Sequence, residues 1–121
     1  MSTMQIDRLL DTVVRTGASD LHLSVGRKPT LRLHGGLKNL DTKVLEGEDC
    51  VSLMKQITPE KAQQELQEEG SCDFGFAFGS QARFRVAIFR QRGDLSLVLR
   101  LIPNELLSFE EIGLPVILKE L

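Results

Sequence analysis

Two arginines, Arg85 and Arg100, lie in neighbouring runs that alternate polar and apolar residues. A glycine, Gly93, lies between these runs, which predicts a β-hairpin with a two-residue loop. If the loop residues are Gly93 and Asp94, the two arginines are diagonal neighbours across the hairpin. If they are Arg92 and Gly93, the arginines are direct partners. Both registers place the two guanidinium groups on one face of the sheet.

Two guanidinium groups at diagonal or directly opposed positions of a hairpin repel each other. The pair is best tolerated when each group is solvated, meets a carboxylate, or shares an anion such as a phosphate, which suits the planar donor fork of arginine. Arginines that alternate along a strand are also common on an ordinary solvent-facing surface. An anion site and a plain polar face therefore both remain open as interpretations of Arg85 and Arg100.

A second polar cluster, Asp20 and His22, shares one face of another alternating run. Acid and base side chains can catalyse together, but no nucleophile or orienting group is linked to this pair in the sequence. A structural role is favoured, in which Asp20 and Ser19 bond backbone amides of a turn. Cys50 and Cys72 have no partner at metal-binding spacing, so we expect buried reduced thiols and no metal site.

The composition is that of a single globular domain of 121 residues, with 41% hydrophobic and 26% charged residues. The formal net charge of −2 disfavours a protein that binds nucleic acid by neutralising phosphates. No apolar run approaches the ~20 residues of a membrane helix, and the N-terminus lacks the pattern of a signal peptide. We therefore expect a cytoplasmic protein with no nucleic-acid partner and no membrane insertion.

Apolar residues at helical spacing predict a first helix that Gly17 ends, with Ser2 and Gln5 as its capping box. Two more helices are expected between residues 45 and 70. The second of these begins with Thr58 as its N-cap. Alternating runs predict strands over residues 20–25, 31–34 and 73–78 and in the hairpin between residues 81 and 102.

Three of the six phenylalanines, Phe74, Phe76 and Phe78, alternate along one predicted strand. A connecting loop with an odd number of residues, such as 79–81, places them on the same face as Phe84. We expect this strand to lie at the centre of the core rather than at a sheet edge.

The last residues predict an element that the chain does not complete. A capping box at residues 108–111 and an apolar helix face are followed by the final residue, Leu121. We interpret the chain as one domain of a longer protein. The apolar face comprises Leu114, Ile117, Leu118 and Leu121.

Several motifs in order resemble the N-terminal part of the type II/IV secretion and pilus motor ATPases, most closely the PilT-like branch of twitching motility and pilus retraction. The ordered set covers nearly the whole chain and is far more specific than any one motif. The motifs are GASDLHL at residues 17–23, RLHG at 32–35, RFRV at 83–86, QRG at 91–93, LRLIP at 99–103 and FEEIGLP at 109–115.

The resemblance implies an α+β, PAS-like domain over residues 1–102, with a largely antiparallel sheet and helices packed on one face. Residues 103–121 would be a linker and the start of a RecA-like ATPase domain. The full-length protein would be an ATP-hydrolysing motor that uses ATP and Mg²⁺ and forms a homohexamer through the neighbouring ATPase domain. It would contact an inner-membrane platform protein of the pilus, peripheral to that membrane.

The resemblance also assigns site residues, with Arg85 and Arg100 approaching the nucleotide phosphates. The sequence contains no GxxxxGK[ST] phosphate loop, so the 121 residues alone are expected to be inactive, with no catalytic residue and no tightly bound cofactor. Further residues that could face nucleotide or an interface are Arg83, Arg92, Asp20, His22 and Arg32.

Two alternatives remain open. The chain could be the N-terminal domain of a pilus extension or type II secretion ATPase, although a match that begins near Met1 favours the retraction branch. It could also be a freestanding PAS-like module that senses a small ligand. Such a module needs an interior cavity. The apolar residues of this chain are numerous enough to fill a core but not to line a cavity as well.

Overall fold

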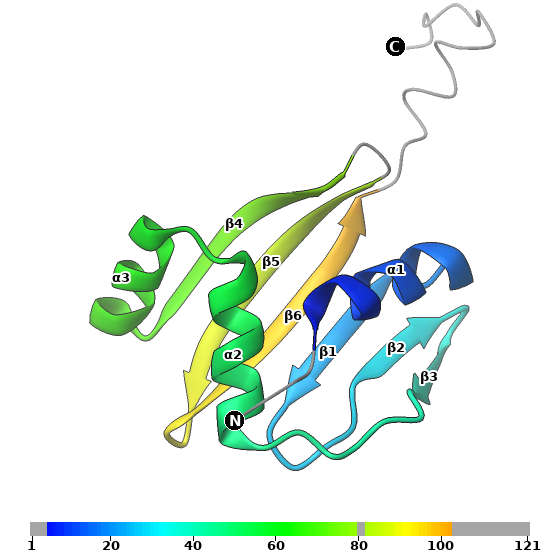
Figure 1. The fold of residues 1–121 in the computed structure, drawn as a ribbon, viewed down its shortest axis with the longest axis horizontal. Helices are drawn as coiled ribbons and strands as arrows, with labels where there is room; N and C mark the ends of the chain where they lie inside the picture. The colour runs from blue at the N-terminus through cyan, green and yellow to red at the C-terminus, as the bar shows by residue number, and fades with distance from the viewer. Residues whose placement is uncertain (1–4, 80–81, 103–121) are drawn as a thin grey trace, which may run out of the picture.

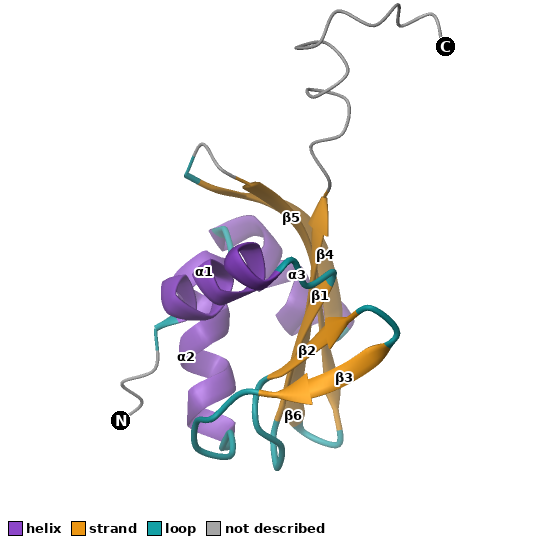
Figure 2. Ribbon diagram, turned by 90° about the vertical axis from the view of Figure 1, so that its right-hand side faces the viewer, coloured by secondary structure: helices purple, strands orange, loops and turns teal. Residues whose placement is uncertain are grey.

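The computed structural model describes residues 5–79 and 82–102, which form a sheet with helices on one side (Figures 1 and 2). Within these residues, six antiparallel strands form one sheet in the order β3-β2-β1-β6-β5-β4, accompanied by three helices. The predicted α+β class with an antiparallel sheet is therefore confirmed. The elements are α1 (Ile6–Thr16), β1 (Asp20–Ser24), β2 (Thr30–Leu33), β3 (Gly36–Asn39), α2 (Gly47–Ile57), α3 (Glu60–Glu69), β4 (Ser71–Phe78), β5 (Ala82–Gln91) and β6 (Asp94–Ile102).

Helix α1 forms because its apolar residues recur on one face, which is buried. It ends at Gly17, as predicted, in the left-handed conformation (φ 77°) with its N–H donating to the carbonyl of Val13. At the other end, Gln5 occupies the N-cap position without a side-chain cap, and Ser2 lies outside the described residues. The buried residues of α1 are Ile6, Leu9, Leu10 and Val13.

The boundary between α2 and α3 differs from the prediction. Thr58 is the C-cap of α2, and its N–H donates to the carbonyl of Met54. Pro59, whose ring fixes φ at −62°, takes the N-cap position of α3. The side chain of Thr58 therefore does not cap α3, because its backbone completes the preceding helix.

The centre of the core lies over β1 and β6, where Leu21, Leu23, Leu97 and Leu99 are fully buried. The prediction that the phenylalanine strand is central is wrong, since β4 is an edge strand. Phe74, Phe76 and Phe78 face the helices but are only partly buried. The predicted register is confirmed, because Phe78 pairs with Ala82 and leaves residues 79–81 between them. Alternation identifies the face of a strand, whereas its place in the sheet depends on which distant strand joins it.

The predicted strands at residues 20–25 and 31–34 are confirmed as β1 and β2, which pair antiparallel, but β3 was not predicted. All four residues of β3 are exposed, so no alternation of buried and exposed positions marks it in the sequence. Cys50 and Cys72 are buried free thiols, as expected, and burial raises the pKa of Cys50 to about 11. The predicted capping box at 108–111, the helix face after it and the domain boundary at residue 103 fall outside the described residues.

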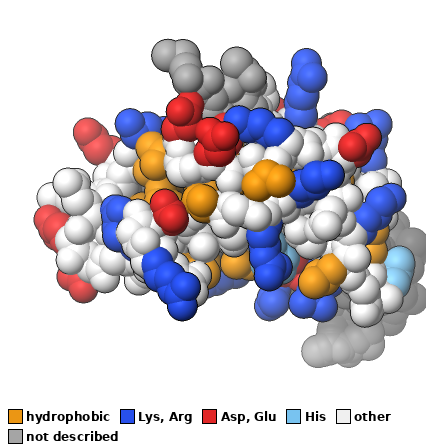
Figure 3. Space-filling view, turned by 90° about the horizontal axis from the view of Figure 1, so that it is seen from below, with side chains coloured by type: hydrophobic (Ala, Val, Ile, Leu, Met, Phe, Trp, Pro, Cys, Tyr) orange, Lys and Arg blue, Asp and Glu red, His pale blue; other side chains and the backbone are white. Residues whose placement is uncertain are grey.

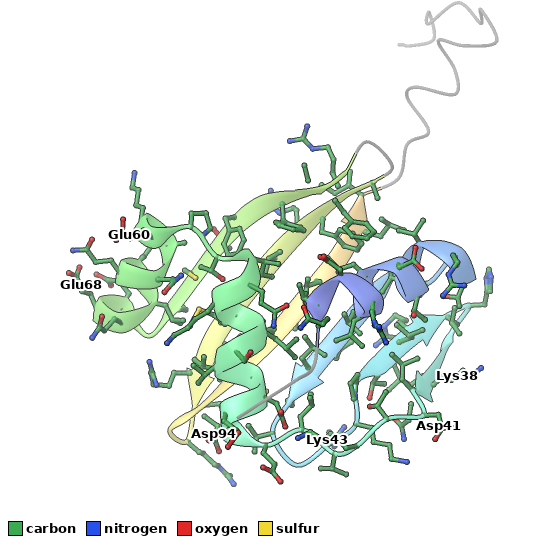
Figure 4. All side chains as sticks on the ribbon, in the orientation of Figure 1. Lys38, Asp41, Lys43, Glu60, Glu68 and Asp94 are labelled. Carbon is green, nitrogen blue, oxygen red and sulfur yellow. The ribbon has the colours of Figure 1, made fainter. Side chains whose placement is uncertain are left out.

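The start of α2 is fixed by charged groups. Asp49 accepts from the backbone N–H of Glu46 at 2.8 Å and forms a salt bridge with Lys43 at 2.9 Å. Lys43 lies in the loop before α2, and Asp94, the first residue of β6, lies near the same end of α2 (Figure 4). The hydrogen bond to Asp49 raises the pKa of Lys43.

Candidate functional site: a row of paired charges on the open sheet face

The hairpin of β5 and β6 has the second of the two possible registers. Gln91 pairs with Asp94, so Arg92 and Gly93 are the loop residues, with φ of 55° and 84°. Positive φ at both positions is what a type I′ turn requires, and this turn matches the twist of the strands. As a result Arg85 and Arg100 are direct partners.

Strand pairing extends this pair into a row on the face of the sheet that the helices leave open (Figure 2). Arg100 also pairs with Asp20, Asp20 pairs with Arg32, and Arg85 pairs with Gly75. Directly paired positions share a face, with Cβ atoms about 4.5–5.5 Å apart. We call these positions the charged row; from β2 to β4 it reads Arg32, Asp20, Arg100, Arg85, Gly75.

The carboxylate of Asp20 is the buried anion of the charged row, with only 5% of the residue exposed. Its Oδ1 accepts from Nε of Arg100 at 3.0 Å, and its Oδ2 accepts from the hydroxyl of Ser19 at 2.9 Å. Nε of Arg32 lies 3.7 Å from Oδ2. Burial alone raises the pKa of Asp20, but the hydrogen bonds from Arg100 and Ser19 and the charge of Arg100 outweigh it and lower that pKa. Asp20 is therefore ionised at neutral pH.

These contacts correct the prediction that Asp20 bonds backbone amides of a turn. The sequence gives no sign of the pair with Arg100, because 80 residues separate the two positions. Only the placement of β6 beside β1 brings them together. The alternation within each strand predicts the face on which Asp20 and Arg100 lie. That the two strands are neighbours can be known only from the order of the strands in the sheet.

Arg85 differs from Arg100 in its partners. It is exposed, and among residues 5–79 and 82–102 it forms no hydrogen bond or salt bridge. On its other side, a Cβ added at Gly75 would meet nothing within 4 Å. Within the described part of the chain, the donors of Arg85 therefore have no partner, and there is open space beside Gly75. This geometry fits an anionic group such as a phosphate.

Other predicted site residues line an adjacent open groove of about 620 Å³. His22, Arg32 and Arg92 contribute to it, whereas Arg85 and Arg100 do not. Nε2 of His22 is buried and has no hydrogen-bond partner within the described part of the chain. Lys and Arg side chains are spread over the lower side of the molecule, where histidines also appear (Figure 3). The predicted residues thus form two neighbouring groups that share Arg32.

The last of these residues, Arg83, is exposed on β5 and pairs with Ala77 and Ile102. It shares the face of Arg85, two residues away, but has no place in the charged row. No group of three potential metal ligands occurs among the described residues. None of the helices in the described part is long and apolar enough to cross a membrane.

No family model matches the chain, whereas the curated proteins that it resembles include pilus ATPases. The chain is 35% identical over 116 residues to the type IV pilus retraction ATPase PilT of Pseudomonas aeruginosa, covering 96% of the chain and 34% of PilT. It is 30% identical over 118 residues to the type IV pilus ATPase PilU of the same organism, covering 98% and 31%. The chain thus spans about a third of the length of these relatives.

Comparison with solved structures also identifies PilT as similar. The crystal structure of the pilus retraction motor PilT with bound ADP matches with a TM-score of 0.80 and 36% identity, over 95% of the chain and 34% of PilT. The ATPase DotB of Legionella pneumophila matches with a TM-score of 0.67 and 23% identity, over 81% and 29%, which supports the fold alone. Together, the sequence and fold similarities support an N-terminal domain of a PilT-like type II/IV secretion ATPase.

Proposed function

We propose that the chain is the nucleotide-facing domain of an ATP-driven motor for type IV pilus retraction, in which Arg85 and Arg100 bind the phosphates of ATP. The observation that carries this proposal is the direct pairing of these arginines on the open sheet face. Arg85 has no hydrogen-bond partner among the residues that the structure describes, and the side chain of Arg100 is 72% exposed. Each guanidinium offers a permanent charge and a donor fork that fits phosphate oxygens. Similarity to a PilT structure with bound ADP supports a nucleotide as the anion.

The rest of the motor belongs, in this proposal, to a longer protein. Residues 1–102 are its N-terminal domain, and residues 103–121 lead into a RecA-like ATPase domain that carries the phosphate loop. ATP, accompanied by Mg²⁺, binds between the two domains. The protein works as a cytoplasmic homohexamer peripheral to the inner membrane, where it contacts the platform protein of the pilus.

The test is the steady-state ATPase rate of the full-length protein with Arg85→Ala or Arg100→Ala. Arginines that stabilise transition-state charge contribute about 10³- to 10⁵-fold to phosphoryl transfer, so each variant should lose at least about 10³-fold in kcat. Arg90→Ala is the matched control, because Arg90 is exposed on the same strand and points to the opposite face. Near-normal rates in both test variants would contradict the proposal.

The retraction role can be separated from extension or secretion in cells. A strain that lacks its retraction motor should regain twitching motility with the full-length gene and should not regain it with Arg85→Ala. Restored filament assembly or secretion without twitching would instead favour the related motors. The coding sequence after Leu121 tests the freestanding module, since a phosphate-loop motif there excludes it and a stop codon supports it.

A further inference from the structure

We propose that Asp20 is a positioning residue that orients Arg100 toward the nucleotide phosphates. This inference rests on the proposed function of Arg100 and adds a residue that does not itself touch the nucleotide. It begins from the burial of Asp20, whose side chain is 6% exposed, on a sheet face that is otherwise open. A buried carboxylate is costly unless its oxygens are bonded. Here the two carboxylate oxygens of Asp20 accept hydrogen bonds from different residues.

Oδ2 of Asp20 is held by the hydroxyl of Ser19 at 2.9 Å, with Arg32 at 3.7 Å. Oδ1 is left for Arg100. Ser19 is itself fixed by two backbone hydrogen bonds, from its N–H to the carbonyl of Arg32 and from the N–H of Leu101 to its carbonyl. The Oδ2 side of the carboxylate is therefore held by contacts that do not involve the guanidinium of Arg100, so the position of Oδ1 can orient this long and flexible side chain.

The hydrogen bond from Arg100 uses Nε, one of the five N–H donors of a guanidinium. The remaining four belong to the two terminal nitrogens, and the side chain of Arg100 is 72% exposed. A carboxylate that engaged both terminal nitrogens would compete directly with a phosphate. A carboxylate at Nε instead fixes the plane of the guanidinium and leaves the terminal donors available.

The position of Asp20 also explains the asymmetry of the arginine pair. Asp20 lies on the far side of Arg100 from Arg85, because β6 separates β1 from β5. The carboxylate of Asp20 thus offsets the charge of Arg100 from the β1 side. On the β5 side, where Arg85 lies, the charged row has no anion. An added phosphate would meet a fixed guanidinium from Arg100 and an unengaged one from Arg85.

The experiment measures kcat and KM for ATP in the full-length protein with Asp20→Asn, Arg100→Ala and the double variant. Asparagine keeps the shape of Asp20 but removes its charge. We expect Asp20→Asn to lower kcat by on the order of 10- to 100-fold with a smaller change in KM, since a small misplacement of a catalytic group has this effect. The double variant should match Arg100→Ala alone, because Asp20 acts through Arg100. Asp11→Asn is the control, since it removes an exposed ion pair with Arg15 on α1.

A wild-type kcat in Asp20→Asn, while Arg100→Ala is inactive, would overturn the inference and leave the proposed function standing. So would a double variant whose loss is the product of the two single losses. A wild-type rate in Arg100→Ala would overturn the proposed function and the inference with it.

A second measurement needs no variant that must fold. In the 121-residue chain, the Nε–H resonance of Arg100 should exchange slowly with water at neutral pH. Its exchange, corrected for the intrinsic effect of pH, should accelerate relative to that of Arg85 when Asp20 is protonated in acid. Equal protection of the two resonances at neutral pH would show that Asp20 does not hold Arg100 in solution.

Discussion

Arg85 and Arg100 are direct partners in the ladder between β5 and β6, yet within residues 5–79 and 82–102 only Arg100 is bonded to a carboxylate. Like charges at directly opposed positions destabilise a sheet by a few tenths of a kcal/mol. The bond to Asp20 offsets part of this repulsion from one side. The two arginines are therefore expected to contribute differently to the stability of the fold, although both have the same proposed role.

The first prediction follows from this difference. Arg85→Gln should leave the free energy of unfolding unchanged or raise it by up to about 0.5 kcal/mol, because it removes repulsion. Arg100→Gln should lower it by about 1–3 kcal/mol, because the buried Asp20 loses a charged donor. Urea unfolding of the 121-residue chain measures both, with Arg90→Gln as the control on the opposite face. Equal losses in the two variants would contradict the asymmetry.

The second prediction concerns pH. The pKa of Asp20 is lowered in the folded state, so the stabilisation is complete above its unfolded pKa of about 3.9 and is lost as pH falls through the folded value. The free energy of unfolding should therefore fall less between about pH 5 and pH 2 in Asp20→Asn than in the wild type. Denaturant unfolding across this range measures the two slopes. Identical slopes would mean that Asp20 does not contribute.

The third prediction concerns the turn at Arg92 and Gly93. Asn-Gly suits a type I′ turn better than Arg-Gly, so Arg92→Asn should raise the free energy of unfolding by about 0.5–1 kcal/mol. Gly93→Ala should lower it by about 1 kcal/mol or more, because φ there is 84°. Gly75→Ala is the matched control, since Gly75 is not at positive φ and has room for a Cβ. Thermal and urea unfolding give these values, and a stabilising Gly93→Ala would exclude the turn.

The fourth prediction compares two phenylalanines, Phe84 and Phe76, which the sequence predicts to lie on the same face of the sheet. Phe84 is fully buried and packs edge-to-face with Phe78, their ring centroids 6.4 Å apart. Phe84→Ala should therefore lower the free energy of unfolding by about 3–5 kcal/mol. Phe76→Ala on the edge strand β4 should cost about half of that or less, because Phe76 is only partly buried. Similar losses in urea unfolding would place β4 in the core after all.

Local features of the fold could be predicted because each follows from neighbouring residues. The helix face of α1 and its end at Gly17 follow from spacing and from the conformational freedom of glycine. The shared face of Arg85 and Arg100 follows from the even length of a hairpin loop. What was missed depends on contacts between distant segments: the central place of β6, the edge position of β4 and the partner of Asp20. Strand β3 was missed because none of its residues is buried.

The position of β6 in the sheet has a consequence for the order of events during protein synthesis. β1 is made early, but its neighbour on one side, β6, is the last of the six described strands to leave the ribosome. Until then the nascent chain can form β1 with β2 and β3, and separately β4 with β5, each with an unpaired edge. The unpaired edges of β1 and β5 can pair with other chains during this time. They are covered once β6 pairs with both. The sheet can therefore be complete only after β6 has been made, and the bond between Asp20 and Arg100 can form no earlier.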